Sequence, residues 1–175
     1  MIKSRRSVRK YRSRQVPEDL LETVLDAARY APSAGNRQPW EFVVVRDGNI
    51  KKMLVEACFN QDWMLQAPVF IVACINMKIA SATYGERGVR LYCIQSVAAA
   101  IQNMLLAAES LGLSTCWVGA FSEDRVSMIL ECPPYVRPCA IITLGYGKER
   151  PEMPVRAPLK DIVHREKFGV PWRDE

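Results

Sequence analysis

The side chains of this chain that could do chemistry are mostly cations and amides. The segment RRSVR, residues 5–9, alternates guanidinium groups with a hydroxyl. In an extended chain Arg5, Ser7 and Arg9 would point to the same side, and guanidinium forks bind a phosphate or a planar polar ring well. The segment therefore indicates an anion or ring site, although a charged lead-in to a helix would show the same pattern.

Two further segments place amides beside prolines or aromatic rings. Residues 31–40, APSAGNRQPW, supply the hydroxyl of Ser33 and the amides of Asn36 and Gln38, and residues 59–63, FNQDW, supply two more amides. An amide can donate to one atom of a ring and accept from another. Taken alone, residues 31–40 favour an ordinary helix-to-strand turn, whereas residues 59–63 fit a binding loop and a helix-end loop equally.

Most other enzyme signatures are missing from the sequence. It contains no GxGxxG, no P-loop and no GxSxG motif. The one histidine, His164, lies in a polar, arginine-flanked stretch that is typical of a surface residue. The six cysteines form no CxxC pair, so no metal site is expected, and several lie in apolar runs, as in proteins of the reducing cytoplasm. If the chain is an enzyme, a bound cofactor should carry the hard chemistry.

Composition indicates one globular domain spanning residues 1–175. The chain is 49% hydrophobic and 25% charged, with a formal net charge of +5. Much of the positive charge lies in the first fourteen residues, and such an arm suits nucleic acid, an anionic membrane or one bound phosphate. Tyr11 is the only aromatic residue there, which argues against base stacking. No signal peptide is expected, and the longest apolar run, residues 67–75, is shorter than the about 20 residues of a membrane span.

Hydrophobic periodicity predicts the elements that must position these side chains. Helices are expected over residues 17–30, 50–58, 89–111 and 122–131, with Gly112 closing the longest. Strands are expected over residues 42–45, 68–76, 115–118 and 139–144. Residues 78–88 look irregular and are expected to form a mobile lid, and a proline-punctuated, extended tail starts at about residue 148. The pattern predicts an α/β or α+β fold, with a sheet flanked by helices.

In this order, the segments resemble the nitroreductase family of flavin mononucleotide (FMN) enzymes. The resemblance rests on six blocks: RRSVRKY (5–11), ARYAPSAGNRQPWEFVVV (28–45), NQDWMLQAPVFIVAC (60–74), AAAIQNMLLAAESLGLSTCWVGAF (98–121), RPCAIITLGYG (137–147) and RAPLKDIVHREKFG (156–169). It implies an α+β fold of the α/β sandwich type, with a central mixed sheet flanked by helices. It also implies a small-chain NAD(P)H-dependent flavin oxidoreductase that reduces nitroaromatics, quinones or similar acceptors by a ping-pong mechanism. Hydride would pass through the flavin N5, so no side chain is implied as an acid or base.

The resemblance also implies a phosphate end and a ring end for the flavin site. The phosphate and ribityl chain would lie near five residues: Arg5, Arg6, Ser7, Gly145 and Arg156. The isoalloxazine ring would be contacted by Arg9 at N1/C2=O, Asn60 at the polar edge, and Val118 and Gly119 near N5. A fixed Arg9 would stabilise the negative charge that reduction places on N1/C2=O.

The remaining implications concern a partner subunit. The resemblance implies an obligate homodimer with FMN at the interface, where Pro32, Ser33 and Ala34 of the other subunit cover one flavin face, with Asn36 nearby. The long helix would lie at the dimer core, and the tail would be exchanged between subunits. The chain departs from the family at Ser96, where aspartate is common, and residues 78–88 are short compared with the pocket-shaping insertion of larger members.

Two other functions remain open at this point. The chain could store or sense flavin without rapid turnover. It could also be a basic nucleic-acid-binding domain, which would be colourless and lose affinity steeply with salt. The resemblance favours an enzyme with a small-molecule acceptor, no nucleic acid, no membrane and a cytoplasmic location.

Overall fold

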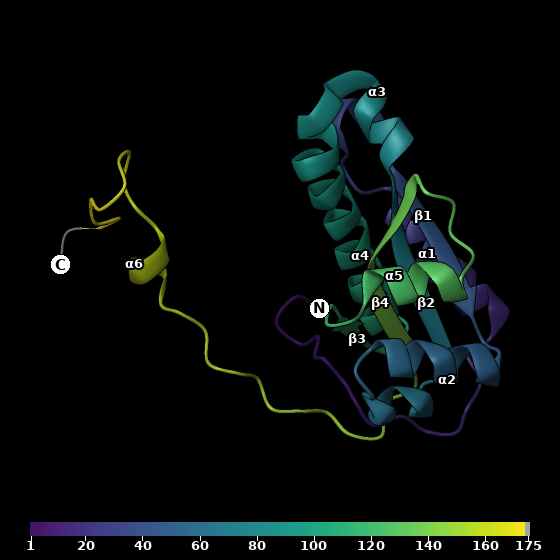
Figure 1. The fold of residues 1–175 in the computed structure, drawn as a ribbon. Helices are drawn as coiled ribbons and strands as arrows, with labels where there is room; N and C mark the ends of the chain where they lie inside the picture. Colours follow the sequence, from purple (N-terminus) through teal and green to yellow (C-terminus); the bar gives the residue numbers. More distant parts are fainter. Residues whose placement is uncertain (174–175) are drawn as a thin grey trace.

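A four-stranded sheet runs through the computed structural model, which describes residues 1–173 (Figure 1). Its strands are β1 (Trp40–Val45), β2 (Val69–Asn76), β3 (Ser114–Val118) and β4 (Val136–Gly145), in the spatial order β1-β2-β4-β3. All three neighbouring pairs are antiparallel. The α+β class is confirmed, but the mixed character expected of the sheet is reduced, in the described part of the chain, to one parallel bridge between Ser7 and Thr115.

Helices cover both faces of this sheet. They are α1 (Glu18–Arg29), α2 (Gly48–Ala57), α3 (Met77–Arg87), α4 (Cys93–Ser110), α5 (Glu123–Ile129) and α6 (Leu159–Ile162), with short 3₁₀ segments at Ala34–Asn36 and Asp62–Gln66. Residues of α1 and α4 pack on one face and residues of α2 and α5 on the other. Successive side chains of β2 alternate between the two cores, with Ile71 in one and Phe70 in the other. This explains why the sequence of β2 is apolar at nearly every position.

The region expected to form an irregular lid is helical instead. Helix α3 begins at the Asn76 side chain, which accepts a hydrogen bond from the Ile79 amide at 3.3 Å. Gly85, with φ +53°, interrupts the helix, and the chain passes through a π-helical turn, Gly88–Tyr92, into α4. A Cβ at Gly88 would collide with the Ala80 carbonyl, so this glycine permits the close return of the chain. The glycines therefore make a bend between helices, not a loop.

The helical stretch from Met77 to Ser110 is long and apolar enough to cross a membrane by length and composition alone. The bend at Gly85 interrupts it, and Figure 1 shows the chain turning over the top of the molecule into α4. The buried face of α4, which includes Val97, Ile101 and Met104, belongs to the core against the sheet. The burial of this face is what a core helix of a globular fold requires.

The N-terminal arm lies extended beside β3 and the end of β4. The Val8 amide donates to the Thr115 carbonyl at 2.9 Å, and the Arg12 amide donates to the Tyr146 carbonyl at 2.8 Å. The Tyr11 ring is buried, and its hydroxyl lies 2.8 Å from the Val8 carbonyl and 2.7 Å from the Thr143 hydroxyl. Burial is the main cause that raises the pKa of Tyr11, so this phenol stays protonated. Tyr11 thereby fastens the arm to the core.

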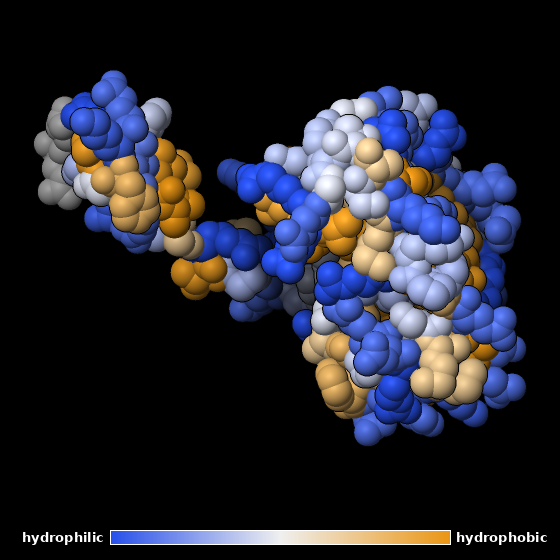
Figure 2. Space-filling model, turned by 45° about the horizontal axis from the view of Figure 1, so that its top comes forward, coloured by the Kyte–Doolittle hydropathy of each residue, from blue (hydrophilic) through white to orange (hydrophobic). Residues whose placement is uncertain are grey.

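The C-terminal tail leaves the body beyond β4 (Figure 1). It contains the short helix α6, and its apolar side chains are exposed in the single chain, including Val155 at 98% and Phe168 at 93%. Figure 2 shows hydrophobic residues open to view along the tail. Such exposure of large apolar groups is typical of a segment that packs on a partner.

Candidate functional site

Arg5, Ser7 and Arg9 lie on one side of the arm, as the alternation predicts. The arm that carries them lies beside β3, where Ser7 pairs with Thr115, next to the buried Cys116. Burial raises the pKa of this thiol, while the Arg9 charge, a hydrogen bond with the Ser7 side chain and the Arg5 charge each oppose that rise. The structure thus gathers two cations and a hydroxyl against β3.

The parallel direction of the arm carries Arg9 toward the far end of β3. Ser7 pairs with Thr115 in parallel. Arg9, two residues further along the arm, therefore lies near Trp117, which is also two residues further along β3. There the Arg9 guanidinium stands 5.6 Å from the centre of the Trp63 ring, a distance at which a cation is attracted to the ring face. Trp63 therefore helps to fix the direction of Arg9.

The loop after α2 is attached to the same strand end. The Gln61 amide donates to the carbonyls of Cys58 at 3.1 Å and Ala120 at 3.2 Å. Phe59 and Asn60 both have φ +57°, a left-handed conformation that turns the chain here. A Cβ at Gly119 would meet only the Trp117 ring nitrogen, at 3.8 Å, so the strand end stays open. Arg9, Asn60, Val118 and Gly119 are thus brought to one region.

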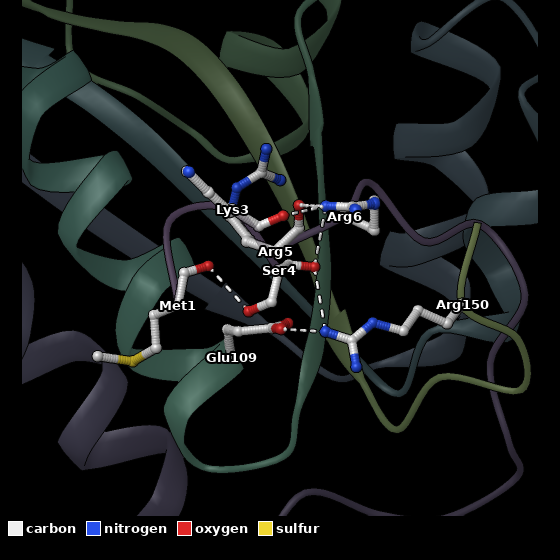
Figure 3. A network of polar contacts seen from close by, with 7 residues as sticks. All are labelled: Met1, Lys3, Ser4, Arg5, Arg6, Glu109 and Arg150. Atoms are coloured by element: carbon white, nitrogen blue, oxygen red, sulfur yellow. Dashed lines mark hydrogen bonds and ion pairs between the residues drawn. The ribbon is translucent and has the colours of Figure 1, made fainter. Parts of the chain in front are cut away.

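Arg6 does not join this group. Its guanidinium Nη1 donates to the carbonyls of Lys3, Ser4 and Arg5 at 2.8, 3.1 and 2.9 Å. Figure 3 shows the Arg6 guanidinium pointing away from that of Arg5, with Arg150 joining the same backbone from the other side. Arg6 was expected beside Arg5 and Ser7. In the single chain its guanidinium lies on the opposite side of the arm, because successive side chains of an extended segment point to opposite sides.

Gly145 has a packing role that the sequence does not reveal. A Cβ at this position would lie 2.6 Å from the Pro68 Cδ and 3.0 Å from the Tyr11 ring. The glycine therefore permits the close approach of Tyr11 that holds the arm. Its expected nearness to a flavin phosphate stays a prediction.

The turn that contains Pro32, Ser33, Ala34 and Asn36 is ordered but distant from the arm. The Ser33 hydroxyl accepts from the Gln38 amide at 3.0 Å, and Gly35, with φ +53°, lies where a Cβ would strike the Tyr84 hydroxyl. The turn is thus held against α3.

The sheet separates this turn from the arm. The arm pairs at Thr115, which lies level with Leu144 and Val69, whereas the turn meets the sheet where the Asn76 amide donates to the Pro39 carbonyl. Trp117, near which Arg9 lies, is level with Ile142 and Ile71, and Asn76 is five positions beyond Ile71, a span of about 17 Å at about 3.3 Å per residue. One chain therefore does not bring the turn to Arg9. The tail that contains Arg156 extends away from the body beyond β4 (Figure 1).

The sequence did not predict the part that two residues, Trp63 and Cys116, have near the arm. Trp63 lies within FNQDW, but its place under Arg9 depends on how the loop folds back onto β3. Cys116 lies in a predicted strand, and its nearness to the arm follows only from a bridge between residues more than a hundred positions apart. Neither relation has a local signal in the sequence.

Comparison with known proteins agrees with the fold. The profile of the Nitroreductase family matches residues 2–61 and 55–146. The chain belongs to the nitroreductase family. This nitroreductase is 39% identical over 154 residues to a protein of Methanothermobacter thermautotrophicus that is provisionally named NADH dehydrogenase/NAD(P)H nitroreductase, with 86% of this chain and 77% of that protein covered. It is 30% identical to the FMN reductase [NAD(P)H] of Bacillus subtilis, covering 93% of this chain and 71% of that protein.

Solved structures of similar shape support the same assignment. The NfrA2 structure from Bacillus megaterium superimposes with a TM-score of 0.89 at 29% identity, covering 96% of this nitroreductase and 73% of that chain. The NADPH:FMN oxidoreductase of Vibrio harveyi, solved with NAD+, gives 0.88 at 26% identity, covering 95% and 76%. The predicted α+β, nitroreductase-like fold is therefore confirmed.

Replacing Gly145 tests its packing role. We expect Gly145→Ala to lower the free energy of unfolding by about 1–3 kcal/mol, because the added methyl would force Tyr11 and Pro68 apart. Gly48→Ala is the matched control, since nothing lies within 4 Å of a Cβ there. Urea denaturation of both variants measures the difference. Equal stability of the two would show that the Tyr11 contact does not constrain residue 145.

Proposed function

We propose that this chain is an FMN-dependent oxidoreductase that takes hydride from NAD(P)H and reduces nitroaromatics, quinones or similar acceptors by a ping-pong mechanism. The observation that carries the proposal is the arm fixed to β3 through Val8 and the Ser7–Thr115 bridge, because an extended arm points Arg5, Ser7 and Arg9 to one side. The loop of Asn60 and the open strand end at Gly119 lie along the same edge. The names of the relatives, NAD(P)H nitroreductase and FMN reductase, support the same activity.

The side chains fit FMN in their chemistry. Arg5 and Ser7 offer a cation and a hydroxyl, which suit a phosphate and a ribityl chain. Arg9 and Asn60 offer a cation and an amide, which suit the polar edge of a planar ring. Gly119 leaves the strand end without a side chain, so a ring can approach the backbone there.

Arg9 acts by holding a positive charge in a fixed place. FMN, when bound, supplies the hydride chemistry at its N5. The stacking of Arg9 on Trp63 limits the motion of its guanidinium before any ligand arrives, and a charge that needs no reorganisation stabilises a developing anion most strongly. The ring end contains a cation, an amide, an apolar side chain and a glycine, and none of these has to move a proton.

The proposal includes an obligate homodimer in the cytoplasm. The turn with Pro32, Ser33 and Ala34 meets the sheet through Pro39, about 17 Å along β2 from the level of Arg9 in its own chain, so a second subunit would have to supply it. The exposed apolar tail favours exchange between subunits, with Arg156 carried along. The cysteines, which are free in the described part of the chain, suit a reducing compartment.

Steady-state kinetics test the activity itself. The purified protein should be yellow and should oxidise NADH or NADPH with menadione or a nitroaromatic as acceptor. Double-reciprocal plots at several acceptor concentrations should give parallel lines, because the first product leaves before the acceptor binds. A yellow protein without turnover would instead support flavin storage, and a colourless protein that takes up no FMN would refute both.

Arg9 provides a second test. We expect Arg9→Ala to weaken FMN binding or slow flavin reduction by about tenfold or more, because the charge opposite N1/C2=O is lost. Arg9→Lys keeps the charge but loses the planar fork, so its FMN affinity and its rate of flavin reduction should lie between those of Arg9→Ala and the native protein. FMN content and stopped-flow reduction by NADPH measure both effects. Unchanged values in Arg9→Ala would refute the role of this residue.

Mixed dimers test whether the site is shared. Arg9→Ala damages the arm, and Pro32→Trp places bulk on the exposed turn, so each variant alone should bind FMN poorly. When the two are coexpressed, random pairing should restore about a quarter of the sites, because one site of each mixed dimer combines an intact arm with an intact turn. FMN content of the coexpressed sample is the measurement. Mixed dimers that regain no FMN would show that the turn and the arm do not share a site.

A further inference from the structure

A second basic cavity lies on the other side of the arm. It has a volume of about 580 Å³ and is lined by Arg6, Arg12, Arg14, Tyr146, Lys148 and Arg150, among others. The end of α4 and the start of β3 complete its wall through Glu109 and Ser114. Three segments far apart in the sequence therefore meet around it: the arm, the helix end and the chain that follows β4.

This cavity is separate from the proposed flavin site. Its arm residues, Arg6, Val8, Arg12 and Arg14, are all even-numbered, whereas Arg5, Ser7 and Arg9 of the proposed flavin site are odd-numbered. An extended segment points successive side chains to opposite sides. Figure 3 shows Arg6 and Arg5 separating in this way. The arm thus stands between the two sites as a shared wall.

The charges around the cavity are only partly neutralised. Glu109 pairs with Arg150 at 3.0 Å, and Glu149 pairs with Lys10 at 2.9 Å. Among the described residues, no carboxylate forms an ion pair with the other four cations, Arg6, Arg12, Arg14 and Lys148. Uncompensated charges of one sign around a concave surface attract the opposite ion.

Several of these cations are already fixed in direction. The Arg12 Nε donates to the Gly147 carbonyl at 3.1 Å, and the Arg14 guanidinium lies 4.0 Å from the centre of the Tyr146 ring. The Arg6 Nε is buried and has no hydrogen-bond partner among residues 1–173, which is costly unless a ligand or water completes it. The arrangement is that of a prepared anion site.

We propose that this cavity binds an anion with two or more linked phosphates, independently of the flavin. Four cations without carboxylate partners exceed what one phosphate needs, since a guanidinium fork uses two oxygens at once. The Ser114 hydroxyl adds a neutral donor on the wall, and it has room there because a Cβ at Gly147 would lie 2.5 Å from its oxygen. Inorganic pyrophosphate and the diphosphate group of a nucleotide share this chemistry.

Titration of the FMN-loaded protein tests the proposal. Isothermal calorimetry with pyrophosphate, ADP and adenosine should show binding of the first two and not of the third. Tighter binding of ADP than of pyrophosphate would show that the site recognises a nucleotide. Equal binding of the two would show that it recognises only the linked phosphates. Absence of pyrophosphate and ADP binding at low ionic strength would overturn the proposal.

A double variant locates the site. Arg12→Gln with Arg14→Gln should weaken pyrophosphate binding by about tenfold or more, through the loss of charge-assisted contacts, while FMN content stays unchanged. The control variant, Arg29→Gln with Arg90→Gln, removes the same net charge from exposed residues elsewhere. Its affinity for pyrophosphate should stay within about twofold of the native value, because exposed ion pairs contribute little. An equal loss in both double variants would show diffuse attraction only. Loss of FMN from the first would place the cavity in the flavin site. Either result would refute the proposal.

Discussion

The hydrogen bond from the Val8 amide to the Thr115 carbonyl fixes the register of the arm on β3, and both groups of cations depend on it. Since side chains alternate along an extended chain, a slip of one residue would exchange the two sides. Arg5 and Arg9 would then leave the proposed flavin side, and Arg6 would take their place. Tyr11 opposes such a slip, because its buried hydroxyl has partners at one register only.

The antiparallel sheet imposes the second constraint, which concerns distance. The arm and the turn at Pro32 lie at opposite ends of β2, so folding of one chain cannot join them. In the proposed homodimer, the arm of one copy and the turn of the other would form one site, because the sheet keeps them apart within a single chain. The exposed apolar tail and the distant turn are two independent features that both favour the proposed homodimer.

The sequence predicted what periodicity encodes and failed where long-range packing decides. The uniformly apolar run of β2 identified a strand covered on both faces, and the alternation of Arg5, Ser7 and Arg9 predicted their common side. The helix α3 was missed because Gly85 and Gly88 are typical of a loop, whereas here they bend and pack a helix. The contact of Trp63 with Arg9 could not be predicted, since it depends on how two distant segments meet β3.

Net charge is a poor guide to what each arginine does in this protein. Arg6 satisfies the carbonyls of its own segment, Arg150 neutralises Glu109, and Arg9 lies over an aromatic ring. A guanidinium over a ring keeps its donors for a ligand while its direction is fixed, as Arg9 does over Trp63 and Arg14 does over Tyr146. A basic arm without such fixed partners would attract any polyanion about equally. The arm divides its cations into two sets, one on each side, and each set has its own fixed partners. This division makes selective binding on each side physically reasonable. It comes from the backbone pairing with β3 and not from composition.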